Sequence, residues 1–287
     1  MDRTLTPEEI KALIHLLGDE DVWVVEHAQA TLRTAGPEAT PYLEIASSTS
    51  IEQAIRVKSR SVIEDIHVDE IEREWVALQA VEEGEALEEG AFLLERMVHP
   101  ERTARQQGAR ADLAVLAAGA REAVPPETAI DEQVDALRRY LHEACGFHGN
   151  IENYYDPENS FLTSVVARRT GIPIALALVY LVIGRRIGVP LVGIGMPMHF
   201  LIGFRAGNGY RYLDPFYGGR EVGRGECRLL LEKAGFDPAE PYLQPAPVVA
   251  ILERMARNLI IIYQNAAREE ELRLARRFVT MLTGAVV

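Results

Sequence analysis

An apolar run from residue 174 to 183, interrupted only by Tyr180, stands beyond the midpoint of the chain. Pro173 suits the first turn of a helix, and Gly188 with Pro190 just beyond it forms a helix stop signal. A helix that is apolar on nearly every side is buried in the protein. The run is also shorter than the roughly 20 apolar residues that cross a bilayer. The pattern therefore predicts a buried helix at the centre of a folded core.

Short strands are predicted to follow this helix, at 191–196, 199–205 and 210–213. The segment Ala206-Gly207-Asn208-Gly209 is typical of a turn between the last two strands. A loop of about four residues there makes His199 and Asp214 cross-strand neighbours. The sequence thus predicts an imidazole beside a carboxylate in a small antiparallel sheet.

Apolar residues recur at helical spacing throughout the first 67 positions. Thr6 and Pro7 begin a first helix, and Gly18-Asp19-Glu20-Asp21 separates it from a second. This leucine-rich helix pair resembles a HEAT repeat, and a weaker unit follows over 38–67. An ordinary helical bundle fits the same pattern. In either case the helices bury their apolar faces only by stacking on each other or on the core.

Further helices are predicted on both sides of the central segment. Between 68 and 144 apolar positions recur at helical spacing and indicate helices that cover the core. Residues 237–247 hold four prolines, which is typical of an extended linker. Apolar positions over 251–262 and 272–282 then form a helix pair that resembles a tetratricopeptide hairpin. We expect this pair to dock on its own protein or on a second copy, the latter giving a homo-oligomer.

The composition limits the number of domains, the partners and the cellular location that we expect for this protein. The 287 residues are 48% hydrophobic, which is ample for one large domain or two to three small ones. A net charge of −13, from 43 acidic and 30 basic side chains, argues against a nucleic-acid surface as the main role. Cys145 and Cys227 are the only cysteines, and the first residues form no basic-then-apolar leader. We therefore expect free thiols, a cytoplasmic location and neither a nucleic-acid nor a membrane partner.

Several unrelated motifs carry a family resemblance. They occur in the order Gly146-Phe147-His148-Gly149-Asn150, Tyr154-Tyr155-Asp156-Pro157, Asn159-Ser160-Phe161-Leu162, Arg169-Thr170-Gly171-Ile172-Pro173-Ile174, and His199-Phe200-Leu201 before Asp214-Pro215-Phe216. Over roughly residues 85 to 280 the chain resembles the transglutaminase-like (papain-like) superfamily, and within it the bacterial SirB-type (YchA-like) branch. The resemblance implies a papain-like core with a Cys-His-Asp triad, whose His and Asp correspond to His199 and Asp214.

One departure from the family pattern falls on the nucleophile. Where the superfamily has Gly-x-Cys, this chain has Gly171-Ile172-Pro173. A proline ring offers neither a proton to lose nor a lone pair for attack. The resemblance therefore implies that His199 and Asp214 form an orienting pair with nothing to activate. Two roles remain for the pair, a hydrogen bond that holds the fold or a polar anchor in a ligand cleft.

Other residues are candidates for chemistry. Cys145, Ser160 or Ser164 could replace the missing nucleophile, although Cys145 follows a predicted helix, where no positive dipole end lowers a thiol pKa. His142, Cys145 and His148 are ligands of a kind that zinc accepts. A fourth ligand and a second separated pair are missing from the sequence, so we predict neither a metal site nor a cofactor.

The segment between 145 and 169 supplies candidates for a cleft wall, namely Asn150, Tyr154, Tyr155, Asn159 and Ser160. Two adjacent tyrosines among polar residues suit a wall that binds a polar ligand. The same residues also fit local structural roles, in which asparagines satisfy loop backbone and tyrosines pack on the core. The sequence leaves both interpretations open.

These patterns predict an α+β protein with three parts. Residues 1–67 form a HEAT-like helical arm, 68–236 a transglutaminase-like core with covering helices, and 237–287 a proline-rich linker with a tetratricopeptide-like helix pair. The predicted function is non-catalytic interaction or regulation, with a peptide or protein partner bound by the degenerate cleft near His199 and by the helical repeats. The alternative is an active acyl-transfer enzyme or hydrolase that uses an unaligned Cys or Ser with His199 and Asp214.

Overall fold

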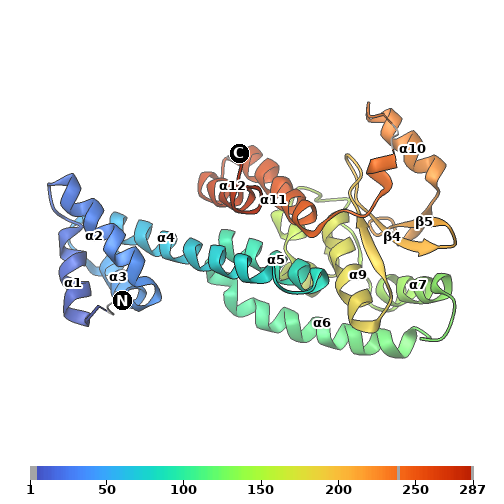
Figure 1. The fold of residues 1–287 in the computed structure, drawn as a ribbon, viewed down its shortest axis with the longest axis horizontal. Coiled ribbons are helices and arrows are strands. Elements are labelled where there is room, and N and C mark those ends of the chain that lie inside the picture. The colour runs from blue at the N-terminus through green and yellow to red at the C-terminus, as the bar shows by residue number, and fades with distance from the viewer. Residues whose placement is uncertain (1–4, 238–239, 286–287) are drawn as a thin grey trace. The chain divides into compact units, whose positions relative to one another are not determined.

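The computed structural model describes residues 5–237 and 240–285, and the chain divides into two compact units, Met1–Val76 and Ala77–Val287. The fold is mostly helical with small sheets, in keeping with an α+β class (Figure 1). No described helix combines the length and the apolar composition that crossing a bilayer requires. The finer division at residues 67 and 236 stays a prediction.

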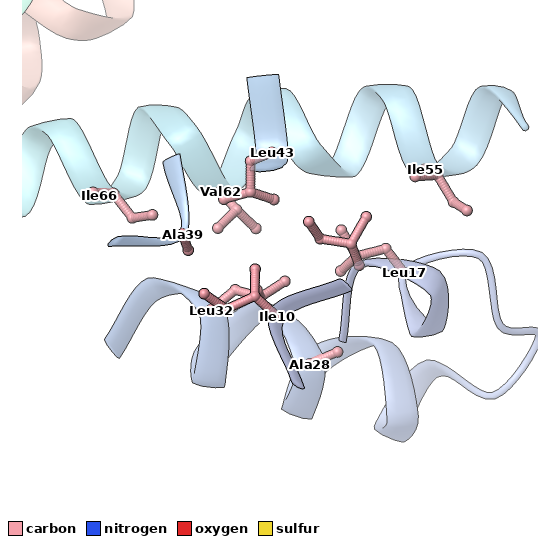
Figure 2. Packing of buried hydrophobic residues seen from close by; sticks show 10 residues of the cluster. Ile10, Leu17, Ala28, Leu32, Ala39, Leu43, Ile55, Val62 and Ile66 are labelled. Carbon is pink, nitrogen blue, oxygen red and sulfur yellow. The ribbon is translucent and has the colours of Figure 1, made fainter. Parts of the chain in front are cut away.

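The first unit consists of α1 (Pro7–Leu16), α2 (Val22–Ala35), a 3-10 turn (Gly36–Glu38), α3 (Thr40–Thr49) and the long α4 (Gln53–Leu78) as far as Val76. A capping box begins α1, because the Glu9 carboxylate accepts the Thr6 backbone N–H at 2.9 Å. Apolar side chains from all four helices meet in one buried cluster, which includes Ile10, Leu32, Leu43 and Val62 (Figure 2). The apolar faces are therefore buried within this unit, and its HEAT-like character stays a prediction.

The second unit contains the remaining elements. Its helices are α5 (Glu83–Val98), α6 (Thr103–Ala123), α7 (Ile130–Arg139), α8 (Leu162–Arg168), α9 (Pro173–Ile187), α10 (Arg224–Lys233), α11 (Val248–Asn265) and α12 (Glu269–Thr283). Strands β3 (Leu191–Ile194), β4 (Leu201–Ala206), β5 (Gly209–Asp214) and β6 (Arg220–Val222) form an antiparallel sheet in that order. The two-residue strands β1 (His148–Gly149) and β2 (Thr170–Gly171) pair in parallel. Short turns of 3-10 or π helix lie at Pro100–Arg102, Tyr140–Ala144, Pro157–Ser160 and Glu240–Leu243.

Helix α9 is the buried helix that the apolar run predicted. It begins at Pro173 and ends at Gly188, whose φ of 82° is a left-handed cap that glycine adopts without strain. The helix lies against α5, α6 and α8 on one side and against β3 and β4 on another (Figure 1). Every side chain from residue 173 to 180 is buried. The first turn of α9 is therefore held in a fixed position relative to the sheet.

The hairpin between β4 and β5 is tighter than the sequence predicted. Ala206 pairs with Gly209, so only Gly207 and Asn208 form the loop, and the prediction of a loop of about four residues is wrong. The φ of 58° at Gly207 allows this shorter turn. Strand β4 begins at Leu201, which leaves His199 outside the ladder. The side chain of His199 must therefore reach Asp214 from the turn before the strand.

The C-terminal helices α11 and α12 pack on each other and on α5. Leu252 fits against Gly90, where an added Cβ would lie 2.4 Å from the Leu252 Cδ1 atom. The Tyr263 hydroxyl lies 3.2 Å from His99 Nε2, and both side chains are buried. The sequence left open whether this helix pair docks on its own protein or on a second copy. The structure shows it docked on its own chain. The tetratricopeptide-like character of the pair stays a prediction.

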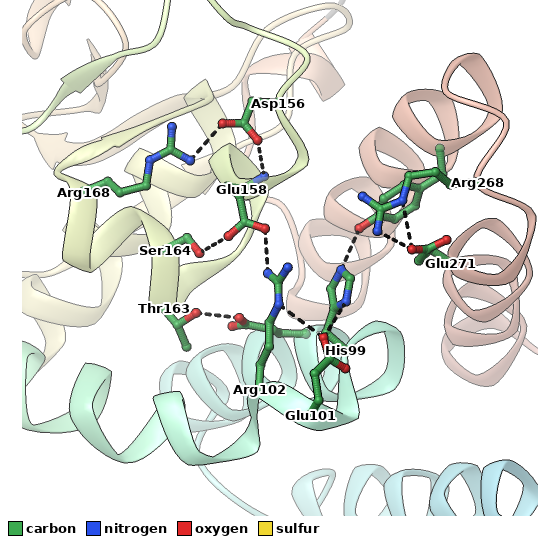
Figure 3. Close-up of polar contacts among 12 residues, drawn as sticks. His99, Glu101, Arg102, Asp156, Glu158, Thr163, Ser164, Arg168, Arg268 and Glu271 are labelled. Carbon is green, nitrogen blue, oxygen red and sulfur yellow. Dashed lines mark hydrogen bonds and ion pairs between the residues drawn. The ribbon is translucent and has the colours of Figure 1, made fainter. Parts of the chain in front are cut away.

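Glu95 is a fully buried carboxylate on α5. The Thr163 hydroxyl donates to its Oε1 at 2.5 Å (Figure 3), whereas Oε2 has no hydrogen-bond partner in the described structure. Burial raises the pKa of Glu95 above its usual value, so the folded protein holds a proton that the unfolded chain releases. Binding of this proton raises the free energy of unfolding. The contribution is fully present below the unfolded-state pKa of about 4.3, and it is lost as the pH rises through the folded-state pKa.

The Glu95→Gln variant is therefore expected to be more stable than the wild type at pH 8, by on the order of 1 kcal/mol. The physical reason is that a neutral amide costs less to bury than a charged oxygen without a partner. The difference should close toward pH 4, where Glu95 is protonated. Urea unfolding of both proteins between pH 4 and 8 measures it, with the exposed Glu122→Gln in α6 as control. A difference that stays constant with pH would refute this assignment.

Candidate functional site

His199 and Asp214 form a close polar pair at one end of the sheet. His199 Nε2 lies 2.8 Å from Asp214 Oδ2, and their side chains are 20% and 3% exposed. The other carboxylate oxygen, Oδ1, accepts the backbone N–H groups of Phe216 at 3.0 Å and Tyr217 at 3.4 Å. Because a carboxylate oxygen accepts this hydrogen bond, the Nε2–H group of His199 donates it. Nδ1 is then the ring nitrogen left for a ligand.

A tight turn before β4 places His199. Met198 has a φ of 62°, a left-handed conformation that is unusual for a residue with a side chain. The His199 backbone N–H donates to the Met196 carbonyl at 3.2 Å and closes this turn. Backbone strain of this kind is kept where the surrounding structure enforces it, and it is common at functional sites. The turn sets the imidazole beside Asp214 although the two residues are not ladder partners.

A pocket of about 340 Å³ opens beside this pair. The start of α9 and the turn that carries His199 form part of its wall, and α11 forms another part. The residues that line it are Tyr154, Tyr155, Ile172, Pro173, Ile174, Met198, His199, Phe200, Arg254, Asn258, Ile261 and Ile262. The lining is mostly apolar and aromatic with a few polar groups, as is common for ligand sites.

The structure separates the five predicted cleft residues into two groups. Tyr154 and Tyr155 line the pocket, with their ring centroids 5.3 Å apart in an edge-to-face contact. Asn150 and Asn159 do not line it, because the Asn150 side-chain amide donates to Asn159 Oδ1 at 3.0 Å and Asn159 donates to the Tyr154 carbonyl at 3.2 Å. Ser160 is buried away from the pocket lining. The asparagines thus shape the loop that presents the tyrosines.

Two polar residues of the pocket were missed by the sequence reasoning, and both come from α11. Arg254 and Asn258 lie one helical turn apart and line the pocket together with Ile261. The Arg254 guanidinium donates to the Met196 carbonyl and lies 5.7 Å from the centre of the Phe200 ring. The spacing of four residues was visible in the sequence, but α11 had been assigned to a separate terminal helix pair. The signal that the sequence offered for this part of the site was a basic residue, Arg254, beside the apolar positions of the same helix.

The transglutaminase-like superfamily model matches residues 107–257, which is more than half of the chain and includes the whole His199–Asp214 region. This chain belongs to the transglutaminase-like superfamily. The match also includes Arg254 on α11, but the pocket residues Asn258, Ile261 and Ile262 lie beyond its end at residue 257.

Curated relatives of this transglutaminase-like protein are similar over about half of its length. A UPF0162 protein of Xylella fastidiosa strain Temecula1 is 42% identical over 139 residues, which cover 46% of this chain and 50% of the relative. A UPF0162 protein of Vibrio cholerae is 35% identical over 133 residues, 46% of this chain and 48% of the relative. Human F-box only protein 21 is 32% identical over 159 residues, 52% of this chain but 25% of that protein. The chain thus spans about half the length of the bacterial relatives, and no solved structure matches it significantly.

In this transglutaminase-like protein Pro173 stands at the first position of α9, on the pocket wall that His199 also lines. None of the described residues that line the pocket is a cysteine, serine or threonine. Ser164, a candidate replacement, donates its hydroxyl to Glu158 Oε2 at 2.6 Å. Cys227 is completely buried under the sheet, and this burial raises its pKa to about 11. Cys145 is half-buried and is also absent from the lining.

Two of the residues considered as zinc ligands, His142 and His148, form hydrogen bonds with backbone carbonyl groups. His142 Nδ1 lies 2.6 Å from the Phe147 carbonyl, and His148 Nδ1 lies 2.9 Å from the Gly146 carbonyl. Burial lowers the pKa of His142, which keeps its ring neutral at physiological pH. Within residues 5–237 and 240–285 no group of three or more His, Cys, Asp and Glu side chains is arranged to hold a metal ion.

A double-mutant cycle tests the role of the His199–Asp214 pair. His199→Ala and Asp214→Asn are each expected to lower the free energy of unfolding by about 1–3 kcal/mol, because each leaves a buried partner unpaired. The double variant should lose less than the sum, because the two residues share one interaction. Urea unfolding of the four proteins measures the cycle. Strictly additive losses would mean that the two side chains do not interact.

Proposed function

We propose that this chain is a non-catalytic member of the transglutaminase-like superfamily that binds a peptide segment of a partner protein in the pocket at the start of α9. The observation that carries the proposal is the position of Pro173, which faces the same pocket as His199 and has no nucleophilic atom. The His199–Asp214 pair then has an orienting and anchoring role. It fixes one polar group in a wall that is mostly apolar and aromatic.

The walls of the pocket support a peptide as ligand. Tyr155 and Ile261 are 67% and 53% exposed and border the pocket, so apolar contact area is open to a partner. Exposed aromatic and apolar residues beside a few fixed polar groups are characteristic of sites that bind extended segments. The alternative, acyl transfer or hydrolysis by an unaligned Cys or Ser, has no supporting contact among the described pocket residues.

Several finer features belong to the same proposal. We place the chain in the SirB-type branch, in the cytoplasm, with HEAT-like helices over 1–67 and tetratricopeptide-like helices at 251–282 as further surfaces for a protein partner. Contact of the C-terminal helices with a second copy belongs to the same proposal. Nucleic acid is not part of this proposal, because the net charge is −13.

Binding of a synthetic hexapeptide library tests the proposed function. Peptides enriched on the wild-type protein are titrated by fluorescence anisotropy against Ile261→Arg, which places a charge on the pocket wall. Val249→Arg is the matched control, because it adds the same charge to an exposed position of the same helix outside the pocket. We expect at least tenfold weaker binding to Ile261→Arg and unchanged binding to Val249→Arg. Equal loss in both variants, or no enriched peptide, would overturn the proposal.

A further inference from the structure

Arg254 brings a positive charge to the pocket that no described carboxylate neutralises. None of the described Asp and Glu side chains forms an ion pair with it, and its one protein hydrogen bond is donated to the Met196 carbonyl. Two other arginines of the C-terminal helices have acidic partners. Arg257, on the same helix, lies 2.8 Å from Glu253, and Arg268 bonds to Glu271.

The environment of Arg254 makes this unpaired charge costly. Burial lowers its pKa, and the phenol of Tyr154 opposes this effect. In a protein with a net charge of −13, a half-buried guanidinium without an acidic partner is unusual. The remaining guanidinium N–H groups are donors in a planar fork, which matches the two oxygens of a carboxylate. The Arg254 fork, which lines the pocket, therefore offers donors that an anion would accept.

Two further groups in the pocket favour the same ligand. Asn258 lies one turn after Arg254 on α11, and its side-chain amide can donate to an oxygen beside the guanidinium. Ile174 is second in the 15-residue helix α9, at a position whose backbone N–H has no partner within the helix. The positive end of that helix dipole also faces the pocket wall formed by residues 172–174. Arginine, amide and helix end together favour negative charge.

We propose that Arg254 and Asn258 bind a carboxylate of the peptide segment, while the apolar wall at Ile261 and Ile262 takes an adjacent apolar side chain. This inference rests on the proposed function and names the group that the pocket recognises. Two sources supply that chemistry, a free C-terminal carboxylate and the side chain of an Asp or Glu. The lining residues bind the carboxylate itself in either case, so the two sources are separated by experiment.

Three forms of one hexapeptide library test the inference. The first form has apolar sequences with a free C-terminal carboxylate, the second has the same sequences with a C-terminal amide, and the third has amidated sequences with one glutamate. We expect binding to the first or the third form to be about 10- to 100-fold tighter than to the second, as a charge-assisted pair provides. Whichever form binds identifies the source.

Variants of α11 assign the effect to Arg254. Arg254→Gln should weaken binding of the carboxylate form at least tenfold and leave binding of the amide form unchanged, whereas Arg254→Lys should retain part of the difference. Arg257→Gln is the matched control, because it removes an exposed charge from the same helix. Circular dichroism of each variant verifies that it is folded.

The outcomes separate this inference from the proposed function. Equal binding of all three peptide forms, lost in Ile261→Arg, would overturn carboxylate recognition and leave peptide binding intact. Binding of no form would overturn the proposed function itself. A carboxylate preference that persists unchanged in Arg254→Gln would overturn the assignment of Arg254.

Discussion

The Pro173→Cys variant is expected to gain a thiolate with an apparent pKa below 7, where the wild type has no nucleophile. Position 173 is the first residue of α9, so a thiolate there is stabilised by the helix dipole, and His199 lines the same pocket with Nδ1 unused. At pH 6 we expect alkylation about tenfold faster than that of an ordinary cysteine, since the larger thiolate fraction outweighs its lower nucleophilicity. Iodoacetamide labelling followed by mass spectrometry measures the rate against pH.

The chain supplies its own references for this experiment. Cys227, whose burial raises its pKa to about 11, should remain unlabelled, and Cys145 gives the rate of a cysteine outside the pocket. Adding His199→Ala to Pro173→Cys should return the alkylation profile toward that of an ordinary thiol. Fast labelling that does not depend on His199, or no fast labelling at all, would show that position 173 does not correspond to the nucleophile of the superfamily.

Glu88→Ala is expected to lower the free energy of unfolding by about 3 kcal/mol, because it removes the shared partner of two arginines. Glu88 on α5 is 2% exposed and lies 3.1 Å from Arg185 Nη2 and 2.5 Å from Arg186 Nη2. Both arginines stand in the last turn of α9 and are less than one-third exposed, so the loss leaves two poorly hydrated charges. Urea unfolding of the variant and the wild type measures the cost.

The neighbouring Glu89 provides a matched control for this ion pair. Glu89 pairs with Arg110, but their side chains are 30% and 39% exposed, so Glu89→Ala should cost about 1 kcal/mol or less. At the same residue type on the same helix, the contrast compares a buried carboxylate shared by two arginines with a partly exposed one that has a single partner. Equal losses at the two positions would contradict the view that Glu88 anchors the end of α9 on α5.

The buried helix and the polar pair were predictable from local pattern. The apolar run, Pro173 and Gly188 together fixed the bounds of α9, because each signal acts within one helical turn. The contact of His199 with Asp214 was also predicted, but on the incorrect assumption that the two residues pair across neighbouring strands. The loop has two residues rather than about four, and the left-handed turn at Met198 supplies the approach that strand pairing does not.

The remaining parts of the site could not be read from local pattern. Strands β1 and β2 have two residues each, which is too short for any period to show. Arg254 reaches the pocket because α11 docks on the core, and its contact with Met196 joins residues 58 apart in the sequence, which no spacing rule predicts. The asparagines at 150 and 159 bond to each other, and the sequence could not separate that role from ligand binding. Tertiary contacts, not propensity, decided each of these points.

Turnover by the purified wild-type protein on a panel of glutamine peptides, thioesters and esters tests the central claim most directly. We predict no transamidation, deamidation or hydrolysis faster than that of the His199→Ala variant, because Pro173, which lines the pocket, has no nucleophilic atom. Turnover that disappears in His199→Ala, and also on removal of one particular cysteine or serine, would contradict the account.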